Sequence, residues 1–593
     1  MERSETNMKE TSKSAMRRAR DPSFQQHYFA GKGIDIGAGD DPLNAHAHAF
    51  PRVTEIVSWD KAQGDALRMA GAPDASFDFV HSSHCLEHLT NPFQGLARWL
   101  ELLKPGGYAI LTVPDEDLYE KGKWPSPFNR EHKVSFTICK PEKTLPGSVN
   151  VLDLVRAFAP VASCERVTLV RENYDERRAN VDQTARGLAE CAIEIVLRKR
   201  AVPSARDMMN VASKARDAQE SLRAWRLAVK TYPYRFEVYH GAMLAWLRWD
   251  LIEDIDRLWA QCIECLPDQH LPRLYHALHT IARGKIQEGF RTRESWMSKF
   301  GWQRRTTVQP PSTIRAWSGE PLGGKSIVIW SEFGLGDEIF FLRFARILRE
   351  RCGAAQVSVV CQAPLVTLFE RSGEADTVLS VAQAAELPPH DYWVFPHAIP
   401  AHVALDLEAL PKSVPYLHAP GKTAFPALTE SKGKLKVGVV FKGAPTHEND
   451  RQRSLPSLSV LDDLFKVDDA EFFSLQKGAG ADEAADYAKR LPNFHDVGAS
   501  LRTMDETANA IAALDVVLTV DTSVAHVAAA MGKPVWLMLP FFGDWRWHYT
   551  RNDSPWYPTM RLFRRLPGGD WSEVVARIRG RLLMALTSGD ANL

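Results

Sequence analysis

Two stretches of the chain combine short polar side chains with backbone that suits a phosphate group. One runs from Ser331 to Glu338 and contains two glycines and Asp337; the other is Asp521–Ser523, roughly 185 residues further on. Each follows an apolar, strand-like segment and opens a helix-like one, and free N–H groups at a helix start favour a diphosphate. A carboxylate facing such a group could deprotonate an acceptor hydroxyl. The spacing predicts two nucleotide-binding halves that face each other across a cleft.

Other predicted strand ends in the second half carry cations and an amide. These side chains are Lys442, Arg451, Arg453, Gln476 and Lys477. The carboxyl ends of parallel strands meet at one edge of a sheet, so these groups should converge with residues 521–523 on a nucleoside diphosphate leaving group. The polar loop 447–454 is long, so the sequence does not determine which of the four cations contacts phosphate.

A third group lies near the N-terminus, where a predicted strand runs into the turn Gly37–Gly39. A dinucleotide fingerprint requires a third glycine three residues after Gly39, but Pro42 and Leu43 fill that stretch. A ligand without a pyrophosphate is therefore favoured, and S-adenosylmethionine is such a ligand. Asp60 ends the next strand, 21 residues after Gly39, where a ribose needs an acid, and Asp65 could meet the adenine amino group.

Residues 31–200 resemble the class I S-adenosylmethionine-dependent methyltransferases. The matching positions are Asp35-x-Gly37-x-Gly39, Asp60, Asp65, Phe77-Asp78-Phe79-Val80 and Leu103-Lys-Pro-Gly-Gly107. The resemblance implies a Rossmann-like, seven-stranded sheet with S-adenosylmethionine at the carboxyl ends of its strands. The predicted cofactor-binding residues are Asp35, Gly37, Gly39, Asp60 and Asp65. A degenerate domain that no longer binds the cofactor is the alternative.

Residues 205–305 lose strand character and carry a helical repeat. Pro233 and Pro267 are 34 residues apart and each ends an amphipathic helix, with a small residue five positions earlier and a tryptophan eight positions earlier. Small and large residues at such offsets let helix pairs stack, as in tetratricopeptide (TPR) repeats. A helical linker with accidental spacing is the alternative.

The last 270 or so residues resemble GT-B glycosyltransferases of the bacterial heptosyltransferase family, especially members fused behind TPR repeats, and more distantly the O-linked N-acetylglucosamine transferases. The matching segments are Trp330–Glu338, Phe441-Lys-Gly443 with His447, Arg451-x-Arg453-Ser454, Asp521–His526 and Ser554–Arg564. The resemblance implies twin Rossmann-like domains and metal-independent, inverting transfer from a nucleotide sugar, with a bacterial cell-surface glycan as the kind of product. Phe333 replaces a glutamine that is usual in the repeat-fused members.

Carried over residue by residue, the resemblance makes Asp337 the catalytic base. The predicted donor-binding residues are Lys442, Arg451, Arg453, Gln476, Lys477, Asp521, Thr522, Ser523 and His526. An inactive GT-B domain kept for binding is the alternative.

Four other patterns are set aside. His84-Cys-Leu-Glu-His88 matches an inverted zinc-peptidase motif and would place two histidines on one helix face, but no third-ligand motif accompanies it, so we predict no metal site. Gly319–Ser326 fits the P-loop pattern but enters a strand instead of opening a helix. Cys262-x-x-Cys265 and Asp254-x-Asp256 lie in repeat helices and are predicted to be packing and solvated positions, respectively.

Composition limits the function classes. The 593 residues suit roughly three to four domains. Seventy-three basic and 73 acidic residues cancel, so no overall field recruits nucleic acid or an anionic membrane. Eight cysteines are too few for a disulfide framework. No run of about 18 apolar residues suggests a membrane span, and the polar N-terminus does not resemble a secretory signal, so a cytoplasmic location is expected.

The sequence therefore predicts a multidomain α/β enzyme that both methylates and glycosylates one glycan or glycosylated protein, with the repeats binding that acceptor. The predicted domains are a disordered tail over 1–20, a methyltransferase over 21–200, TPR-like repeats over 205–305, and GT-B halves over 322–430 and 433–585, the second of which binds the donor. A scaffold whose repeats recruit a partner, with one or both Rossmann-type domains silent, is the alternative.

Overall fold

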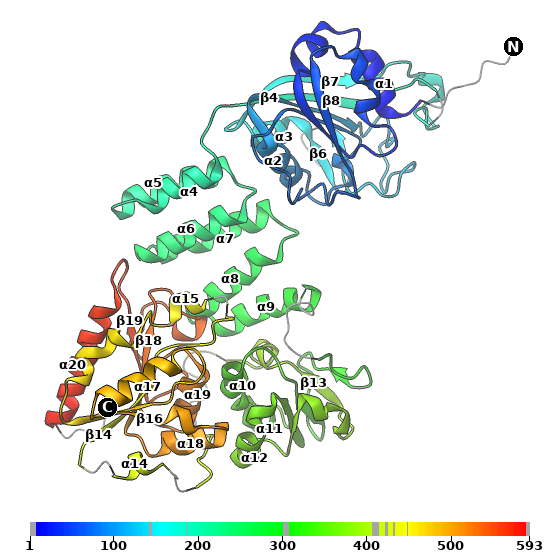
Figure 1. The fold of residues 1–593 in the computed structure, drawn as a ribbon. Helices are drawn as coiled ribbons and strands as arrows, with labels where there is room; N and C mark the ends of the chain where they lie inside the picture. The colour runs from blue at the N-terminus through cyan, green and yellow to red at the C-terminus, as the bar shows by residue number, and fades with distance from the viewer. Residues whose placement is uncertain are drawn as a thin grey trace. The chain divides into compact units, whose positions relative to one another are not determined.

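The computed structural model describes residues 8–140, 145–185, 187–300, 308–405, 414–421, 425–430, 433–447 and 449–588. The chain divides into two compact units, residues 1–272 and 273–593 (Figure 1). The boundary falls inside the region 205–305, so helices that we predicted as one repeat domain are shared between the two units.

The first unit is built on a six-stranded sheet in the order β2-β1-β3-β4-β8-β7. Its strands are β1 (Gly31–Ile36), β2 (Val53–Trp59), β3 (Phe77–Ser83), β4 (Leu103–Pro114), β7 (Ala162–Val170) and β8 (Ala192–Lys199). β8 is antiparallel to its neighbours and the other pairs are parallel. The described sheet has six strands and not the seven that the resemblance implies, because residues 60–76, rich in glycine, proline and aspartate, form turns instead of another strand.

Two helices and a small sheet complete the core of this unit. They are α2 (Pro92–Leu102), α3 (Val151–Ala157), β5 (Ser135–Thr137) and β6 (Ser148–Asn150). Asn91 caps α2 by accepting a hydrogen bond from the N–H of Gln94 over 3.1 Å, and Pro92 occupies the first helical position, where no N–H is needed. Trp99 of α2 is fully buried against the sheet.

The expected disorder of residues 1–20 is wrong for the described part of that segment. Helix α1 (Glu10–Arg18) forms there because its charged side chains find partners in the domain. Lys13 Nζ donates to the carbonyl of Thr184 over 2.6 Å, and the fully buried Arg18 donates to Glu194 Oε2 over 2.7 Å. Residues 1–7 lie outside the described part of the chain.

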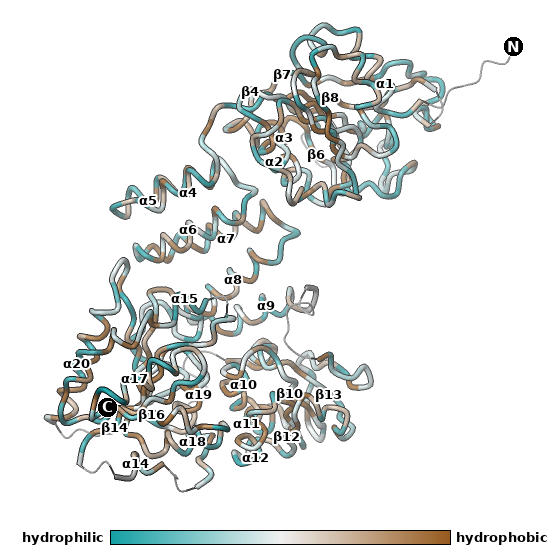
Figure 2. The backbone as a smooth tube through the Cα atoms, viewed as in Figure 1, coloured by the Kyte–Doolittle hydropathy of each residue, from teal (hydrophilic) through white to brown (hydrophobic). Residues whose placement is uncertain are grey.

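Four helices follow β8 in the first unit: α4 (Ala205–Ser213), α5 (Ala218–Thr231), α6 (Phe236–Arg248) and α7 (Ile252–Cys265). Helices α5 and α7 end two residues before the prolines that predicted their ends. Figure 2 shows hydrophobic and hydrophilic residues alternating along these helices, as expected of amphipathic segments. Trp225 of α5 packs on Gly241 of α6, where a Cβ would lie 2.4 Å from the indole. The helices are as predicted, whereas their assignment as TPR repeats stays a prediction.

Helix α8 (His270–Ala282) crosses the boundary between the units, and α9 (Ile286–Phe300) follows it in the second unit. A five-stranded parallel sheet follows in the order β12-β11-β10-β13-β9. Its strands are β9 (Arg315–Ala316), β10 (Ser326–Ile329), β11 (Gln356–Cys361), β12 (Thr377–Ser380) and β13 (Tyr392–Val394), and its helices are α10 (Leu335–Leu342), α11 (Phe344–Glu350), α12 (Val366–Ser372) and α13 (Ile399–His402). Ser326 begins a strand, which confirms that the P-loop match is accidental.

The second half of this unit is a six-stranded parallel sheet in the order β16-β15-β14-β17-β18-β19. Its strands are β14 (Leu435–Val440), β15 (Ala470–Ser474), β16 (Phe494–Asp496), β17 (Val516–Val520), β18 (Val535–Leu539) and β19 (Met560–Arg564). Its helices are α14 (Pro426–Glu430), α15 (Asp450–Arg453), α16 (Asp462–Phe465), α17 (Ala481–Arg490), α18 (Met504–Ala512), α19 (Ser523–Ala530) and α20 (Trp571–Ser588). The predicted boundary between the halves falls at 431–432, outside the described residues.

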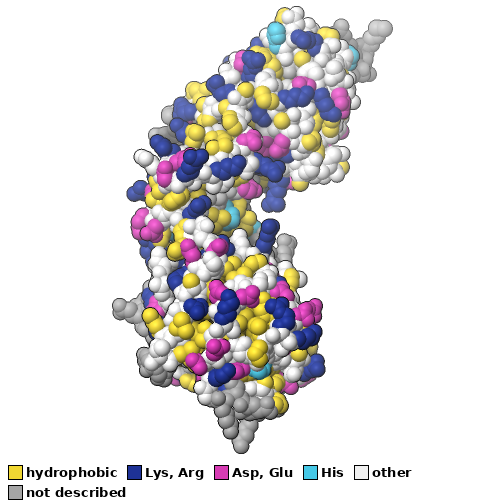
Figure 3. All heavy atoms as spheres, turned by 60° about the vertical axis from the view of Figure 1, so that its left-hand side comes forward, with side chains coloured by type: hydrophobic (Ala, Val, Ile, Leu, Met, Phe, Trp, Pro, Cys, Tyr) yellow, Lys and Arg dark blue, Asp and Glu magenta, His cyan; other side chains and the backbone are white. Residues whose placement is uncertain are grey.

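The surface shows no separation of charge on the face drawn in Figure 3, where basic and acidic side chains are intermixed. This fits the equal numbers of basic and acidic residues in the sequence. Among the described helices, none combines the length and the apolar character that a membrane crossing requires.

Candidate active sites

The glycine loop after β10 leads into α10, whose first turn carries Asp337. The N–H of Gly334 donates to Asp337 Oδ2 over 3.0 Å, which fixes the carboxylate at the helix start. Phe333 has a φ of +63°, a left-handed conformation that is uncommon for a residue with a Cβ. The loop thus turns tightly before the helix and leaves Asp337 Oδ1 to side chains from other elements.

Gly336 brings the start of α10 against the start of α19. A Cβ at this position would lie 2.9 Å from Cδ2 of His526 and 3.8 Å from Cα of Ser523. The imidazole of His526 is buried, and its Nδ1 lies 3.0 Å from the hydroxyl of Tyr557, so the ring has little room to move aside. The two strand-to-helix junctions that the sequence singled out therefore meet in space, and only glycine permits the approach.

Helix α19 begins without a side-chain cap. Thr522 occupies the cap position, but its hydroxyl lies 3.3 Å from that of Thr519 and accepts from none of the first-turn amides. Uncapped amides at a helix start are the donors that a bound anion uses. Residues 521–523 thus keep the backbone arrangement that the sequence predicts for holding a diphosphate.

Asp521 lies at this helix start in a partly buried position. Its Oδ2 accepts a hydrogen bond from Nε1 of Trp547 over 2.8 Å, and its side chain is 18% exposed. Burial, and then the charge of Asp544, raise the pKa of the Asp521 carboxyl to about 6. A hydroxyl-bearing ligand would therefore meet either a donor or an acceptor there, depending on pH.

Arg546 connects the two junctions, and the sequence analysis missed it. Its Nη2 pairs with Asp337 Oδ1, and its Nη1 donates to Asp544 Oδ1 over 2.8 Å. Burial lowers the pKa of the guanidinium, but the carboxylates of Asp544, Asp337 and Asp521 raise it by more. With only 7% of its side chain exposed, Arg546 is a charged group held among three carboxylates.

The loop after β18 is the signal that could have revealed Arg546. Like β14, β15 and β17, the parallel strand β18 ends at the sheet edge that faces the other half. It is followed by Asp-Trp-Arg-Trp-His over 544–548, a cluster of charged and aromatic side chains that the sequence analysis did not weigh. The end of β18 thus carries the same kind of signal as the ends of β14, β15 and β17.

His397 forms a second link to Asp337. Its Nε2 lies 3.6 Å from Asp337 Oδ1, and its Nδ1 lies 3.0 Å from Oε2 of the fully buried Glu332. A row of carboxylate, imidazole and carboxylate can hold a proton beside the proposed base. No local pattern marks His397, because it reaches the loop only through the pairing of β13 with β10.

Two of the predicted donor cations lie on α15. Nη1 of Arg453 donates to the backbone carbonyl of Asp521 over 3.1 Å, which places its guanidinium at the start of α19. Arg451, two residues earlier on the same short helix, is exposed. Arg453 is therefore the predicted cation that the structure brings to the junction.

The other predicted donor residues with long side chains already have partners inside the protein. Lys442 pairs with Glu483 over 2.6 Å, and Nζ of Lys477 donates to the carbonyl of Leu501. Gln476 is 2% exposed; its Oε1 accepts from two backbone N–H groups and its Nε2 donates to backbone carbonyls. A donor would have to displace these contacts, so their roles in donor binding stay predictions.

Glu338 anchors the Asp337 loop from beneath. Its carboxyl accepts hydrogen bonds from the hydroxyl of Ser331 and from the N–H of Gln362, the latter over 2.9 Å. Burial raises the pKa of Glu338 to about 7. Ionising this carboxyl therefore costs folding free energy; the cost is absent below pH about 4.3, the usual pKa of a glutamic acid, and complete above pH about 7.

We expect Glu338→Gln to remove this pH dependence. The stability of the wild type at pH 8 should include a penalty on the order of 3 kcal/mol that is absent at pH 4. The variant should therefore gain melting temperature over the wild type at pH 8 and gain clearly less at pH 5. Thermal unfolding of both full chains at the two pH values measures this, with the exposed Glu350→Gln as the matched control. Equal differences at both pH values would show that the pKa of Glu338 in the folded protein does not lie near 7.

The turn after β1 has the geometry that the sequence predicts for the first site. Gly37 and Gly39 have φ values of +76° and +51°. The N–H of Gly37 donates to the carbonyl of Trp59 over 2.9 Å, and a Cβ on Gly37 would lie 2.6 Å from Cβ of Cys85. The turn is thus pinned between the ends of β2 and β3, where only glycine fits.

Asp35 lies beneath this turn and not on its open side. Oδ2 accepts from the N–H of Leu43 over 2.7 Å, and Oδ1 lies 2.6 Å from Nδ1 of His81, whose Nε2 is 3.0 Å from Arg18. The side chain is buried. Both oxygens are therefore occupied, so Asp35 can serve a cofactor by shaping the turn, whereas direct contact would require rearrangement.

Asp60 and Asp65 lie on the accessible side of the sheet edge. The backbone of Asp60 is fixed by Gln63, and no hydrogen bond to its half-buried carboxylate occurs within the described residues. Asp65 is exposed, and its Oδ1 accepts from the N–H of Leu67 over 3.0 Å. Of the two acids, Asp60 has its carboxylate free for a ribose.

The helix expected over His84–His88 is not formed, so these two histidines do not share a helix face. The N–H of His84 continues the sheet by donating to the carbonyl of Thr112 over 2.9 Å, and His84 has a φ of +54°. A single 3-10 turn follows over Leu86–His88. The pairing with β4 thus extends from β3 to His84, where the first turn of the expected helix would have formed.

Comparison with known proteins supports two enzyme domains. Residues 13–138 match the family model described as a methyltransferase domain, and residues 473–562 match that of glycosyltransferase family 9 (heptosyltransferase). Protein FlbA of Caulobacter vibrioides is 26% identical over 390 residues, 61% of this chain and 64% of that protein. An uncharacterized methyltransferase of Mycobacterium ulcerans is 35% identical over 92 residues, 15% of this chain. The chain thus spans 64% and 35% of the lengths of these two relatives.

Solved structures of both kinds are also similar. A family 9 glycosyl transferase from Veillonella parvula is 13% identical with a TM-score of 0.33, covering 45% of this chain and 99% of that structure. The ADP-heptose LPS heptosyltransferase II of E. coli is 14% identical with a TM-score of 0.31, covering 44% and 100%. An S-adenosylmethionine-dependent methyltransferase from Mesorhizobium loti is 14% identical with a TM-score of 0.21, covering 30% and 97%.

The family models therefore support two domains, one similar to methyltransferases and one similar to the heptosyltransferases of glycosyltransferase family 9.

Proposed function

We propose that this protein is a bifunctional transferase that uses S-adenosylmethionine as methyl donor and a nucleotide sugar as glycosyl donor. Its acceptor is a glycan or a glycosylated protein, and both domains act on that acceptor. Sugar transfer inverts the anomeric centre and is independent of metal, with the start of α19 and Arg453 meeting the charge of the diphosphate. Asp337 removes the proton of the acceptor hydroxyl.

The contact at Gly336 is the observation that carries the glycosyltransferase half of the proposal. It brings the start of α10, which carries Asp337, against the uncapped start of α19. This closeness supports a general base and a leaving-group site that act on one anomeric carbon at the junction of the two halves. Arg546 and His397 hold Asp337 in that position.

The helices α4–α7 have a different role in the proposal. Their amphipathic packing builds a stacked scaffold, and scaffolds of this kind suit recognition of the acceptor. The rival function, a scaffold that recruits a partner while one or both transferase domains are silent, predicts that at least one of the two donors does not bind.

The binding of both donors to the full chain tests the function. We expect S-adenosylmethionine to bind, and Asp60→Ala to weaken it about tenfold or more, because two charge-assisted hydrogen bonds to the ribose contribute about 1.5–3 kcal/mol each. One member of a panel of nucleotide sugars should bind the wild type and Asp60→Ala equally well. Calorimetry measures both, with the exposed Glu172→Ala as control. Equal affinity of the wild type and Asp60→Ala for S-adenosylmethionine would refute the cofactor site. If neither S-adenosylmethionine nor any nucleotide sugar binds, the scaffold is favoured.

A further inference from the structure

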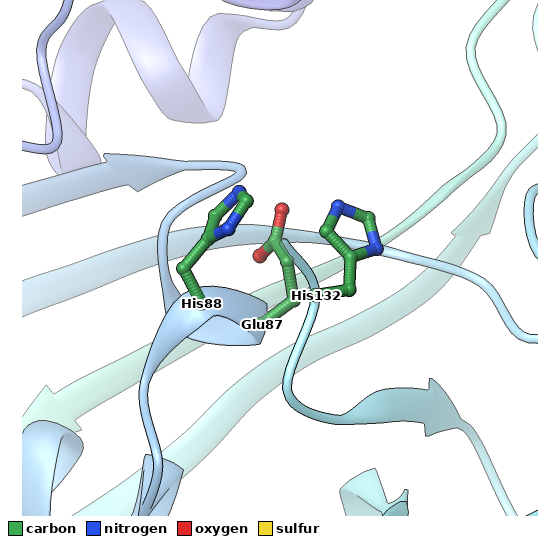
Figure 4. Close-up of side chains that lie close together, drawn as sticks. All are labelled: Glu87, His88 and His132. Atoms are coloured by element: carbon green, nitrogen blue, oxygen red, sulfur yellow. The ribbon is translucent and has the colours of Figure 1, made fainter. Parts of the chain in front are cut away.

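Three side chains that the proposed reactions do not use lie together in the first unit. Glu87 and His88 belong to the short turn after β3, and His132 comes from a loop more than 40 residues further on. One ligand atom from each residue lies within 4.8 Å of the other two. Figure 4 shows the carboxylate of Glu87 between the two imidazole rings.

The carboxylate of Glu87 is buried without the hydrogen bonds that burial demands. The residue is fully buried, and neither carboxylate oxygen has a hydrogen-bond partner within the described residues. Among the described residues, Glu87 forms an ion pair with His84, whose Nδ1 lies 3.5 Å from Oε1, which is longer than a good hydrogen bond. A buried carboxylate is costly unless its oxygens are hydrogen-bonded or bind a metal, and the long contact with His84 leaves both oxygens of Glu87 without a hydrogen bond, so the group could accept a further cation.

His132 is held in the tautomer that a metal ligand needs. Its Nδ1 lies 2.6 Å from Oε1 of Glu120, which is fully buried, so Nδ1 donates its hydrogen to the carboxylate and Nε2 is left as an acceptor. Nδ1 of His88 likewise lies 3.3 Å from the carbonyl oxygen of Glu131 and can donate to it, which leaves Nε2 of His88 as an acceptor. Carboxylate–histidine–metal and carbonyl–histidine–metal arrangements of this kind orient the histidines of metal sites.

The backbone keeps the two segments together before any ion binds. The N–H groups of Lys133 and Val134 donate to the carbonyl of Glu87 over 2.8 and 3.3 Å. His88 and His132 have their ring centroids 4.9 Å apart with the planes near perpendicular. Ligands bound to one ion at about 2.0–2.2 Å lie about 3–4 Å from each other, so small side-chain rotations suffice to close the site.

We propose that Glu87, His88 and His132 bind a divalent transition-metal ion. Two imidazole nitrogens and one carboxylate oxygen suit Zn²⁺, Mn²⁺ or Fe²⁺, and three protein ligands leave coordination positions open. The proposal revises the prediction of no metal, which was made because the sequence shows no third-ligand motif. The third ligand, His132, is supplied by the fold.

The place of this cluster suggests what its open positions hold. It follows β3 at the same sheet edge as the Gly37 turn, which packs on Cys85, two residues before Glu87. An oxygen of the methyl acceptor would suit an open position there. That role rests on the proposed methyltransferase function, whereas the metal site itself does not.

Zinc titration of the chelator-treated full chain tests the site. We expect Zn²⁺ to bind with one tight site per chain that is lost, or weakened about tenfold or more, in His132→Gln and in Glu87→Gln. Glu120→Gln should weaken it because the supporting carboxylate is neutralised. The exposed His27→Gln is the matched control and should bind as the wild type does, since surface histidines contribute only weak binding.

Melting temperature separates a metal ligand from a merely structural carboxylate. Zinc should raise the melting temperature of the wild type and of His27→Gln, but not that of Glu87→Gln or His132→Gln, when each is compared with its own zinc-free sample. Unchanged zinc stoichiometry and affinity in both ligand variants would overturn the proposal. Calorimetry with S-adenosylmethionine on the same samples shows separately whether the methyltransferase function holds.

Discussion

Asp337→Asn is expected to lower the rate of sugar transfer by about 10²–10⁴-fold while donor affinity stays close to the wild-type value. The acceptor hydroxyl must lose its proton as the anomeric carbon is attacked, and an amide cannot take it. Asparagine keeps the size of the side chain and can still accept the hydrogen bond from Gly334, so the loop should keep its shape. Turnover at saturating donor and calorimetric donor affinity together measure the effect.

Asp544→Asn is the matched control for this experiment. Asp544 pairs with the same guanidinium of Arg546 but lies in a different loop, so the variant disturbs the ion pair without removing the proposed base. A similar fall in both variants would mean that the rate depends on Arg546 and not on proton removal by Asp337. Sugar transfer by Asp337→Asn at the wild-type rate would exclude Asp337 as the general base.

The elements that position both sites could be predicted because local pattern determines them. Apolar runs bounded by glycine and proline located β1, β17 and α19, and the prolines at 233 and 267 located the ends of α5 and α7. Short-range steric rules of this kind operate between neighbours in the chain. The same rules failed at His84, where hydrogen bonding to the distant strand β4 outweighed the local preference for a helix.

Side-chain partners could not be predicted, because they depend on residues that meet only in the fold. Lys442, Lys477 and Gln476 have the chemistry of a phosphate site, yet each has contacts inside the protein. His397 and His132 have no recognisable local motif and gain their chemical meaning from Glu332 and Glu120, respectively. Residue type along a strand end thus predicts where a site lies better than it predicts which side chains act in it.

Arg546→Met should cause the largest combined loss of stability and activity. Methionine fills much of the same space but leaves the carboxylates of Asp337, Asp521 and Asp544 without their shared cation, and breaking such a buried pair costs about 3–5 kcal/mol. The released Asp337 should lose its position as well, and a displaced catalytic group typically costs about 10²-fold in rate. Arg546→Lys, which keeps the charge without the two-pronged geometry, should fall between wild type and Arg546→Met on both measurements. Thermal unfolding and transfer rates of the full chains provide the test, and a transfer rate for Arg546→Met equal to that of the wild type would show that Arg546 does not act on Asp337.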